Sequence, residues 1–369
     1  MYRELRRQGV VHDKVHDTWL IAGHADVSRM FRSSQASSRA KARNPFRTGS
    51  LAFGLFEPQL ESLDAPRHGV LRRAFHGMLA PAFEQRLYAH VDATLEALIA
   101  EATSTLDVVS ELAQPMAALV MARCLGLDDE EARAFQADVG ALLLCVRRGE
   151  LDASDARGAE EAASRLLRVT GEVVRRGSPQ APVAAFCADA LAAGASLADV
   201  AGNCVLFVAA GQGPTRDLIA NGLHALLQNP DQMARLASEP SLVPAAVDET
   251  LRYDSPIQII RRKTAAPIQV AGTTIAAGET LSLVIGAANH DDRVYRAPEQ
   301  FMPAREEKGH LAFGLARHRC LGTAIARVAA EATFRRLLSN HTKLRLARRP
   351  ERHASLSFSG LRSLVCTGF

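Results

Sequence analysis

Residues 310–327 read "HLAFGLARHRCLGTAIAR", and this stretch places a cysteine in an unusual setting. A glycine-containing coil leads into Cys320, and a helix is predicted to begin directly after it. A cysteine at the start of a helix meets free backbone N–H groups and the positive end of the helix dipole, and both favour the thiolate. Gly314 permits a tight turn upstream, and Gly322 permits the close approach of another group. We therefore expect Cys320 to be a nucleophile or a metal ligand.

The surroundings of Cys320 favour a metal ligand. A nucleophilic cysteine needs a base, and His318 is only two residues away in extended coil. A thiolate that ligates a haem iron needs no base. Arg317 and Arg319 add positive charge near the sulfur. The other five cysteines form no CxxC pair and no zinc-like cluster with histidines, so we expect them to be buried free thiols.

The same stretch resembles the haem-ligand loop of the cytochrome P450 monooxygenases, whose pattern is Phe-Gly-x-Gly-x-His/Arg-x-Cys-x-Gly. The matching residues are Phe313, Gly314, His318, Cys320 and Gly322. Ala316 stands where the family usually has its second glycine, which adds one methyl group beneath the macrocycle. The resemblance implies a haem b whose iron is ligated by the thiolate of Cys320.

A second motif, "DETLRYDSP" (248–256), places Glu249 and Arg252 three residues apart on one helical face. An isolated pair of this kind is usually a surface ion pair of small energetic weight. The later stretch "FMPAR" (301–305) supplies Arg305, which resembles the third member of the family's Glu-Arg-Arg network. The resemblance implies a structural network that braces the cysteine loop and takes no part in catalysis.

The stretch "DAPRHGVLRRAF" (64–75) contains a histidine and an arginine four residues apart. His68 and Arg72 are predicted to share one face of a helix capped at Asp64. Such a pair suits carboxylates, and a haem carries two propionates. The alternative is an exposed basic face. By resemblance, the residues that bind the propionates are His68, Arg72, Arg262 and His318.

The stretch "VAAGQGPTRDLIANG" (208–222) lies within a long helix predicted over 196–228. By resemblance this is the distal helix of the family, where an acid and a threonine relay protons to the haem. The positions that match the family's motif are Ala210, Gly211, Gln212, Gly213 and Pro214. Gly213 thus replaces the acid and Pro214 the threonine, and neither relays a proton. Because proline removes a hydrogen bond to the carbonyl of Ala210, we also expect a kink.

The loss of this acid–alcohol pair leaves several alternatives open. Thr215 is one residue late, about 100° around the helix, and is not expected to substitute. One alternative is that hydroxyl or amine groups of the substrate supply the protons. Others are a peroxide-driven enzyme and a reaction such as oxidative coupling, ring formation or rearrangement. A last alternative is a haem-binding recruitment or sensing protein without turnover.

The predicted substrate pocket is largely apolar, which favours a mid-sized, mostly apolar substrate. By resemblance it is lined by the loop 34–62, by the region 145–158 and by five apolar side chains. These are Phe207, Val208, Ile257, Ile259 and Phe358. Ser357 and Ser359 are expected to orient the substrate. The alternative is that several of these residues belong to the core.

The composition is that of a globular chain: 369 residues, of which 47% are hydrophobic and 23% charged. No apolar run reaches the roughly 20 residues that a bilayer requires, and the N-terminus shows no signal-peptide core, so we expect a cytoplasmic protein. The net charge of +4 is too small to indicate nucleic-acid binding. Arg73, Arg317 and Arg319 are expected to form a basic proximal face that attracts a ferredoxin or flavodoxin.

Periodicity predicts a mainly α fold with a small β region. The pattern is helical from Asp64 to about Lys263, and residues 265–287 alternate as strands do. A short strand and a helix are predicted within 18–31, a helix over 321–339 and a β-segment at the C-terminus. Together with the resemblance, this predicts the cytochrome P450 fold as one large domain over 1–369, with an N-terminus shorter than usual.

Overall fold

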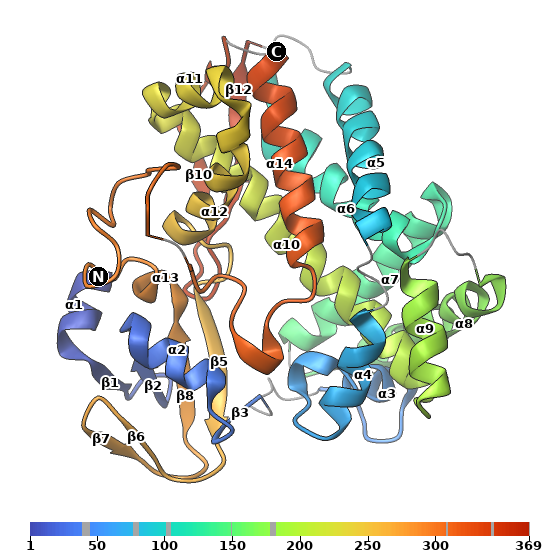
Figure 1. The fold of residues 1–369 in the computed structure, drawn as a ribbon. Helices are drawn as coiled ribbons and strands as arrows, with labels where there is room; N and C mark the ends of the chain where they lie inside the picture. The colour runs from blue at the N-terminus through green and yellow to red at the C-terminus, as the bar shows by residue number, and fades with distance from the viewer. Residues whose placement is uncertain are drawn as a thin grey trace. The chain divides into compact units, whose positions relative to one another are not determined.

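The computed structural model describes residues 1–38, 45–76, 81–100, 105–148, 150–177, 182–307, 309–340 and 343–368. Within these residues helices predominate and the strands are short, as the sequence predicts (Figure 1). The chain divides into two compact units. Unit 1 comprises Met1–Ala40, Val91–Met116 and Pro214–Phe369, and unit 2 comprises Lys41–His90 and Ala117–Gly213.

Unit 1 contains a five-stranded sheet in the order β1-β2-β8-β5-β3 (Figure 1). The strands are β1 (Val10–Asp13), β2 (Thr18–Ile21), β3 (Ala36–Ser37), β5 (Ile259–Thr264) and β8 (Thr280–Val284). Only β2 and β8 pair in parallel, and the other pairs in this sheet are antiparallel. Helix α2 (His24–Arg32) buries Val27, Met30 and Phe31 in one apolar cluster with side chains of β8.

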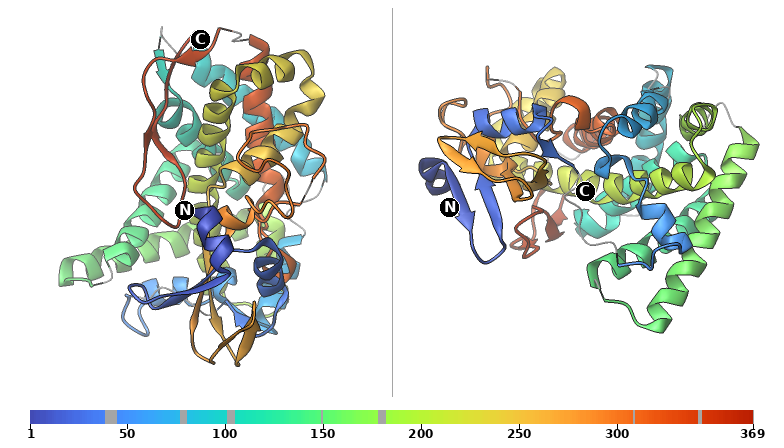
Figure 2. Two further views of the ribbon diagram at one scale, coloured as in Figure 1. Left: turned by 90° about the vertical axis from the view of Figure 1, so that its left-hand side faces the viewer. Right: turned by 90° about the horizontal axis from the view of Figure 1, so that it is seen from below.

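Helix α14 (Thr323–Asn340) follows the cysteine loop in unit 1. It packs against α11 (Pro230–Ser238) and α12 (Val243–Tyr253), and the views in Figures 1 and 2 agree on this arrangement. Helix α1 (Tyr2–Gln8) packs on the short α13 (Ile285–Ala288). Three 3-10 or π segments belong to this unit: η3 (Val108–Ala113), η4 (Pro240–Leu242) and η5 (Ala316–His318).

Three small sheets complete unit 1. A hairpin joins β6 (Ile268–Val270) to β7 (Thr273–Ile275). The C-terminal strand β12 (Val365–Thr367) lies between β4 (Thr105–Asp107) and β9 (Arg345–Leu346). The last pair is β10 (Glu351–Arg352) with β11 (Leu361–Ser363). The predicted β-segments at 265–287 and at the C-terminus are therefore confirmed.

Unit 2 is helical. It contains α3 (Leu51–Phe56), η1 (Leu60–Ser62), α4 (Arg67–His76), α7 (Asp129–Arg148), α8 (Ala153–Arg176) and α9 (Pro182–Ala192). Helix α8 packs along α7 and also contacts α3 and α9 (Figure 2). Helices α4 and α9 meet through the stacked rings of Phe75 and Phe186, whose centroids are 3.9 Å apart.

Three helices contribute residues to both units. They are α5 (Pro81–Ala100), α6 (Gln114–Leu125) and α10 (Leu197–Gln228). Helix α10 confirms the long helix predicted over 196–228, and it remains α-helical through Pro214. Within the described residues one segment, Val108–Leu125, is long and apolar enough to cross a membrane by length and composition alone, and 61% of it is buried inside the protein.

Two predictions about elements are wrong in part. Helix α12 ends at Tyr253, because Pro256 cannot continue a helix, and the β-branched residues after it form β5. The predicted loop 34–62 contains α3 and η1, although residues 39–44 lie outside the described residues. The N-terminus of α3 is stabilised by the carboxylate of Glu160, which accepts hydrogen bonds from the backbone N–H groups of Leu51 and Ala52 at 3.0 and 3.1 Å. This distant partner is invisible in the local sequence.

Candidate active site

Cys320 lies on a short loop of unit 1 between η5 and α14, and it is the only exposed residue among the six cysteines. Its backbone N–H donates to the carbonyl of Phe313 at 2.8 Å, and its own carbonyl accepts from Thr323 Oγ1 at 2.9 Å. Burial raises the pKa of Cys366 to about 12, and it also raises the pKa of Cys124. These two buried cysteines remain thiols at neutral pH, whereas the accessible sulfur stands just before a helix N-terminus.

The loop before Cys320 turns through two residues with positive φ. Gly314 has φ +63°, and Ala316 has φ +57°. The left-handed region is nearly free of strain for glycine but costs an alanine on the order of 1 kcal/mol. The turn therefore requires a left-handed conformation at position 316, where the family usually has its second glycine. This chain adopts that conformation with an alanine.

Two of the predicted propionate-binding residues lie close together in unit 1. The guanidinium carbon of Arg262 lies 5.8 Å from the centre of the Phe31 ring. An edge carbon of the same ring and the carbonyl oxygen of His318 lie 3.5 and 3.7 Å from the place where a Cβ on Gly314 would stand. The structure thus places the Arg262 side chain against Phe31, and it places this ring and the backbone of His318 beside Gly314. Phe31 was missed in the sequence, because it reads as an ordinary core residue of α2.

The other two predicted propionate-binding residues lie in unit 2. His68 is buried on α4, and the half-buried Arg72 follows one turn later on the same helix. The backbone N–H of His68 donates to the carbonyl of Asp64 at 3.1 Å, but α4 begins at Arg67, so Asp64 lies three residues before the helix and not at the cap position that the sequence predicts.

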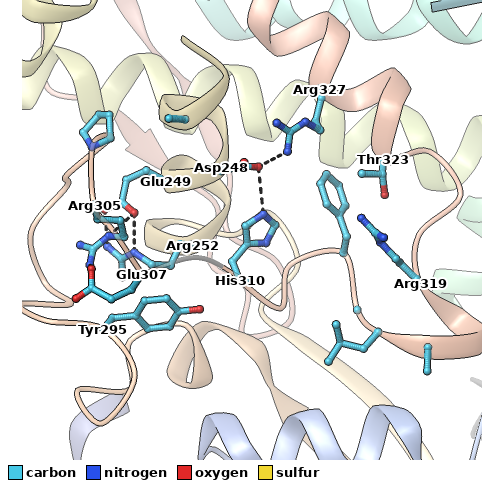
Figure 3. A pocket seen from close by; sticks show the side chains of 17 residues that line it. Asp248, Glu249, Arg252, Tyr295, Arg305, Glu307, His310, Arg319, Thr323 and Arg327 are labelled. Atoms are coloured by element: carbon cyan, nitrogen blue, oxygen red, sulfur yellow. Dashed lines mark hydrogen bonds and ion pairs between the residues drawn. The ribbon is translucent and has the colours of Figure 1, made fainter. Parts of the chain in front are cut away.

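Glu249, Arg252 and Arg305 form a buried ion network in unit 1 (Figure 3). The Nε atoms of Arg252 and Arg305 donate to one carboxylate oxygen of Glu249 at 2.8 and 2.7 Å. All three side chains are at most 4% exposed. Tyr295 lies against both cations, with the guanidinium carbons 5.4 and 5.9 Å from its ring centre. Buried charges of this kind require the pairing that they have here.

The network connects to the cysteine loop through Asn289. Arg252 donates to the carbonyl of Asn289 at 3.0 Å, and Asn289 Oδ1 accepts from the backbone N–H of Leu311 at 2.8 Å. The carbonyl of Leu311 then accepts from the backbone N–H of Gly314 at 2.9 Å. A continuous series of hydrogen bonds therefore leads from the network to the first turn of the loop. Asn289, which makes this connection, belongs to none of the motifs in the sequence.

A pocket of about 450 Å³ lies between the network and the cysteine loop (Figure 3). Asp248 occupies its wall, where it pairs with Arg327 and, at 3.4 Å, with His310. Burial alone would raise the pKa of Asp248. The hydrogen bond from His310 and the charge of Arg327 together outweigh burial, so the pKa lies below its usual value. Arg319 also lines this pocket, so cationic side chains lie beside the loop.

The centre of α10 is open, whereas the residues on both sides are buried. Ala210 is exposed and residues 211–214 are half-buried, between the buried Val208 and Thr215. A Cβ on Gly213 would meet nothing within 4 Å, whereas one on Gly211 would clash with the sulfur of Met121. Apart from Gln212 the side chains of this stretch are small, which leaves room for a flat group against the helix at Gly213. The donor set of the cysteine loop and this open stretch both fit a haem.

The predicted substrate-pocket residues fall into several places. Ile257 and Phe358 form a β-bridge, and Phe358 is 52% exposed. Ile259 instead packs with Tyr2, Leu5 and Leu20 in a separate apolar cluster. In unit 2, Val208 is buried and Phe207 is half-buried.

Of the two serines predicted to orient the substrate, Ser359 has its hydroxyl engaged, whereas Ser357 is held through its backbone carbonyl. The carbonyl of Ser357 accepts from the backbone N–H of Gln258 at 2.9 Å, and Ser359 Oγ donates to Asp254 at 2.5 Å. The predicted lining regions 34–62 and 145–158 lie in α3 and η1 and at the α7–α8 junction, where residue 149 lies outside the described residues.

Known proteins resemble this chain over most of its length. A family model for cytochrome P450 matches residues 184–353. Cytochrome P450 107B1 of Saccharopolyspora erythraea is 30% identical over 355 residues, covering 91% of this chain and 84% of the relative. The 20-oxo-5-O-mycaminosyltylactone 23-monooxygenase of Streptomyces fradiae is 32% identical over 341 residues, covering 89% of this chain and 77% of the relative.

Solved structures match the chain from end to end. The crystal structure of CalO2 superposes with a TM-score of 0.91 at 26% identity, covering 100% of this chain and 95% of that one. P450BioI in complex with an acyl carrier protein carrying hexadec-9Z-enoic acid gives a TM-score of 0.87 at 25% identity, with coverages of 100% and 97%. The fold, the cofactor haem with an axial cysteine thiolate and the oxidoreductase class follow from this likeness. The chain belongs to the cytochrome P450 family.

Proposed function

We propose that Cys320 is the axial thiolate of the haem. Its support is that Cys320 is the one exposed thiol among six, within the matching motif and on a loop tied to the Glu249 network. Once bound, a haem with a thiolate ligand supplies the oxidising centre of this enzyme class. The residues proposed to hold and orient it are His68, Arg72, Arg262 and His318, which would bind the propionates through charge-assisted hydrogen bonds.

The substrate we propose is a mid-sized, largely apolar small molecule of bacterial specialised metabolism. Relatives act, by their names, on a mycaminosyltylactone and in biotin biosynthesis. The reaction is oxygen insertion, oxidative coupling or rearrangement, with a proton relay that differs from the acid–alcohol pair. The observation behind this last point is that Gly213 and Pro214 occupy the relay positions. A peroxide-driven enzyme and a haem-binding protein without turnover are the alternatives that the same observation favours.

A ferredoxin or flavodoxin would deliver electrons to this cytoplasmic enzyme. Arg319 is exposed beside the cysteine loop and Arg317 is half-buried there, while Arg73 is exposed on α4. Such side chains attract an acidic electron-transfer protein.

The carbon monoxide spectrum of the reduced protein tests the ligand assignment. We expect the Soret shift that is typical of a thiolate ligand, its loss in Cys320→Ser, and its retention in Cys204→Ser. Cys204 is a suitable control because it is a buried cysteine on α10. A protein without the shift would contradict the haem-thiolate proposal, and equal effects of the two variants would contradict the assignment to Cys320.

Supply of the oxidant separates the alternatives within the enzyme class. We expect a metabolite that shifts the haem spectrum on binding to be converted when NADPH, ferredoxin reductase, ferredoxin and dioxygen are supplied. Conversion with hydrogen peroxide alone would favour the peroxide-driven alternative. Absence of product under both conditions would favour the non-catalytic protein.

A further inference from the structure

The part of α10 that belongs to unit 1 carries a polar face in an otherwise apolar helix. Asp217, Asn221 and His224 are spaced four and three residues apart, which places them on one side. Asp217 is 5% exposed and Asn221 is 0% exposed. The neighbouring side chains are apolar and buried: Leu218, Ile219, Ala220, Leu223 and Leu226. No part of the proposed function uses this polar face.

Asp217 is a buried acid in close contact with backbone. Its carboxylate accepts from Arg216 Nε at 2.8 Å, and Arg216 also donates to Gln114 at 3.2 Å. A Cβ on Gly360 would lie 2.6 Å from Asp217 Cγ, so the carboxyl group lies directly on the backbone of Gly360. Only a residue without a side chain fits at position 360.

The charged groups around Asp217 come from three elements. Burial is the largest influence and raises the pKa of Asp217 above its usual value. Arg216 on α10 and His353 after β10 lower this pKa, and Asp254 after α12 raises it. The net result is an acid that keeps its proton to higher pH than an exposed aspartate does.

Polar groups lead from this region to the surface. Asn221 Nδ2 donates to the carbonyls of Ser359 and Asp254 at 3.0 and 3.2 Å. Asn221 Oδ1 is fully buried and has no hydrogen-bond partner within the described residues, so it is an acceptor suited to a water molecule. Ser359 Oγ donates to Asp254 at 2.5 Å, and Arg352, which is 44% exposed, donates to the same carboxylate at 2.7 Å.

We propose that Asp217 is the proton-relay residue of this enzyme and that Asn221, Ser359 and Asp254 connect it to solvent. This relay rests on the function proposed above, and it names the residue that would deliver protons in that function. Asp217 follows Pro214 by three residues on α10, so the two residues lie within one helical turn of each other. Each transfer takes one proton from the carboxyl group towards the distal side and leaves a carboxylate held by Arg216. A proton from solvent, passed along Asp254 and Ser359 and then through a water molecule at Asn221 Oδ1, restores the acid.

Infrared pH-difference spectra of the purified resting protein test this without turnover. We expect a protonated-carboxyl band that titrates above the usual aspartate range and is absent in Asp217→Asn. The control is Asp199→Asn, on the same helix, where an asparagine can keep the reciprocal cap with Ser196 but loses the ion pair with the exposed Arg67. Because His353 and Asp254 act with opposite sign, His353→Ala should move the titration up and Asp254→Asn should move it down. A spectrum in which Asp217→Asn removes no band would overturn the proposal.

Dioxygen consumption gives the second readout. With NADPH, ferredoxin reductase and ferredoxin, and no added substrate, Asp217→Asn should consume dioxygen at least about tenfold more slowly. The rate of the unaltered protein should fall as the pH rises through the Asp217 titration, and the variant should lack this fall. Equal rates and pH profiles would overturn the relay, even if the carbon monoxide spectrum is that of a thiolate. A protein without that spectrum would instead refute the proposed function.

Discussion

At the scale of single residues, Ala316 adopts a left-handed backbone conformation that is strained for an alanine. Ala316→Gly removes the left-handed strain, which should stabilise the folded protein by about 1–2 kcal/mol. Glycine also gives the unfolded chain more conformational entropy, which offsets about 0.4–1 kcal/mol of this gain. We therefore expect the free energy of unfolding to rise by about 0.5–1 kcal/mol in urea denaturation. Ala304→Gly is the control, because Ala304 is exposed and is not among the residues with positive φ. Equal stabilisation by both variants would contradict this account.

Asp217 should make the stability of the protein depend on pH. Because burial raises its pKa in the folded state, that state binds the proton more tightly than the unfolded chain does. The contribution is complete below the unfolded pKa of about 4 and is lost as the pH rises through the folded pKa. The free energy of unfolding of the unaltered protein should therefore fall relative to that of Asp217→Asn as the pH rises from about 4 to 8. Parallel pH curves in urea titrations would contradict the raised pKa.

The residues that the sequence identified are those that carry a motif. The ion pairs of the Glu249 network form as its motif predicts, because spacing and order in the chain suffice to recognise it, and Cys320 as the haem ligand stays a prediction. Phe31, Asn289 and Asp217 were missed for a common physical reason. Phe31 lies against Arg262 and Asp217 against Gly360, each more than 100 residues away in the sequence, and Asn289 bonds to Leu311 and Arg252 across 22 and 37 residues. None of these contacts is visible in local residue types.

At the scale of elements, the Glu249 network links α12 to the segment that holds the cysteine loop. Glu249→Gln would leave Arg252 and Arg305 buried without their carboxylate, which typically costs about 3–5 kcal/mol. We expect this loss in urea denaturation, together with weaker retention of the thiolate spectrum. Glu307→Gln is the matched control, because Glu307 is 26% exposed and 3.6 Å from Arg305, and its loss should cost under about 1 kcal/mol. Similar losses in both variants would show that the network does not brace the loop.

In helix α10, Gly213 and Pro214 affect both the stability of the helix and the positions of the family's proton relay. Proline and glycine cost about 3 and 1 kcal/mol in a helix interior, so Gly213→Glu with Pro214→Thr should stabilise the protein. Space exists for this change, since a Cβ on Gly213 would meet nothing within 4 Å. The control is Gly211→Ala, whose methyl group would clash with Met121 and should destabilise the fold. Urea denaturation separates the two.

The same double variant also tests the relay by coupling. If the restored acid and alcohol deliver protons, adding Asp217→Asn to this background should slow dioxygen consumption far less than it does in the unaltered protein. An equal loss in both backgrounds would mean that Asp217 acts on stability and not on proton delivery. Helix α10 is α-helical on both sides of Pro214, and the kink expected there stays a prediction.

At the scale of the whole molecule, the sequence predicted the fold class well because its four motifs occur in the order of one family. The mainly α character and the position of the β regions follow from periodicity, which depends only on neighbouring residues. Element boundaries were less accurate where a distant residue decides them, as Glu160 does for α3. The substrate is not encoded in any motif, because an apolar pocket wall and an apolar core have the same residue types.

The surface charge of the molecule gives the last prediction, which concerns electron delivery. The net charge is only +4, so attraction of an acidic ferredoxin would come from local cations such as Arg319. Electron transfer from ferredoxin, measured by stopped flow, should slow by about tenfold as ionic strength rises from about 0.05 to 0.5 M, because salt screens this attraction. Arg319→Glu should slow the reaction at low salt and have little effect at high salt. Arg133→Glu makes the same change of net charge at an exposed position on α7, and it should behave as the unaltered protein. If both variants slow the reaction equally, total charge and not the cysteine-loop face guides the partner.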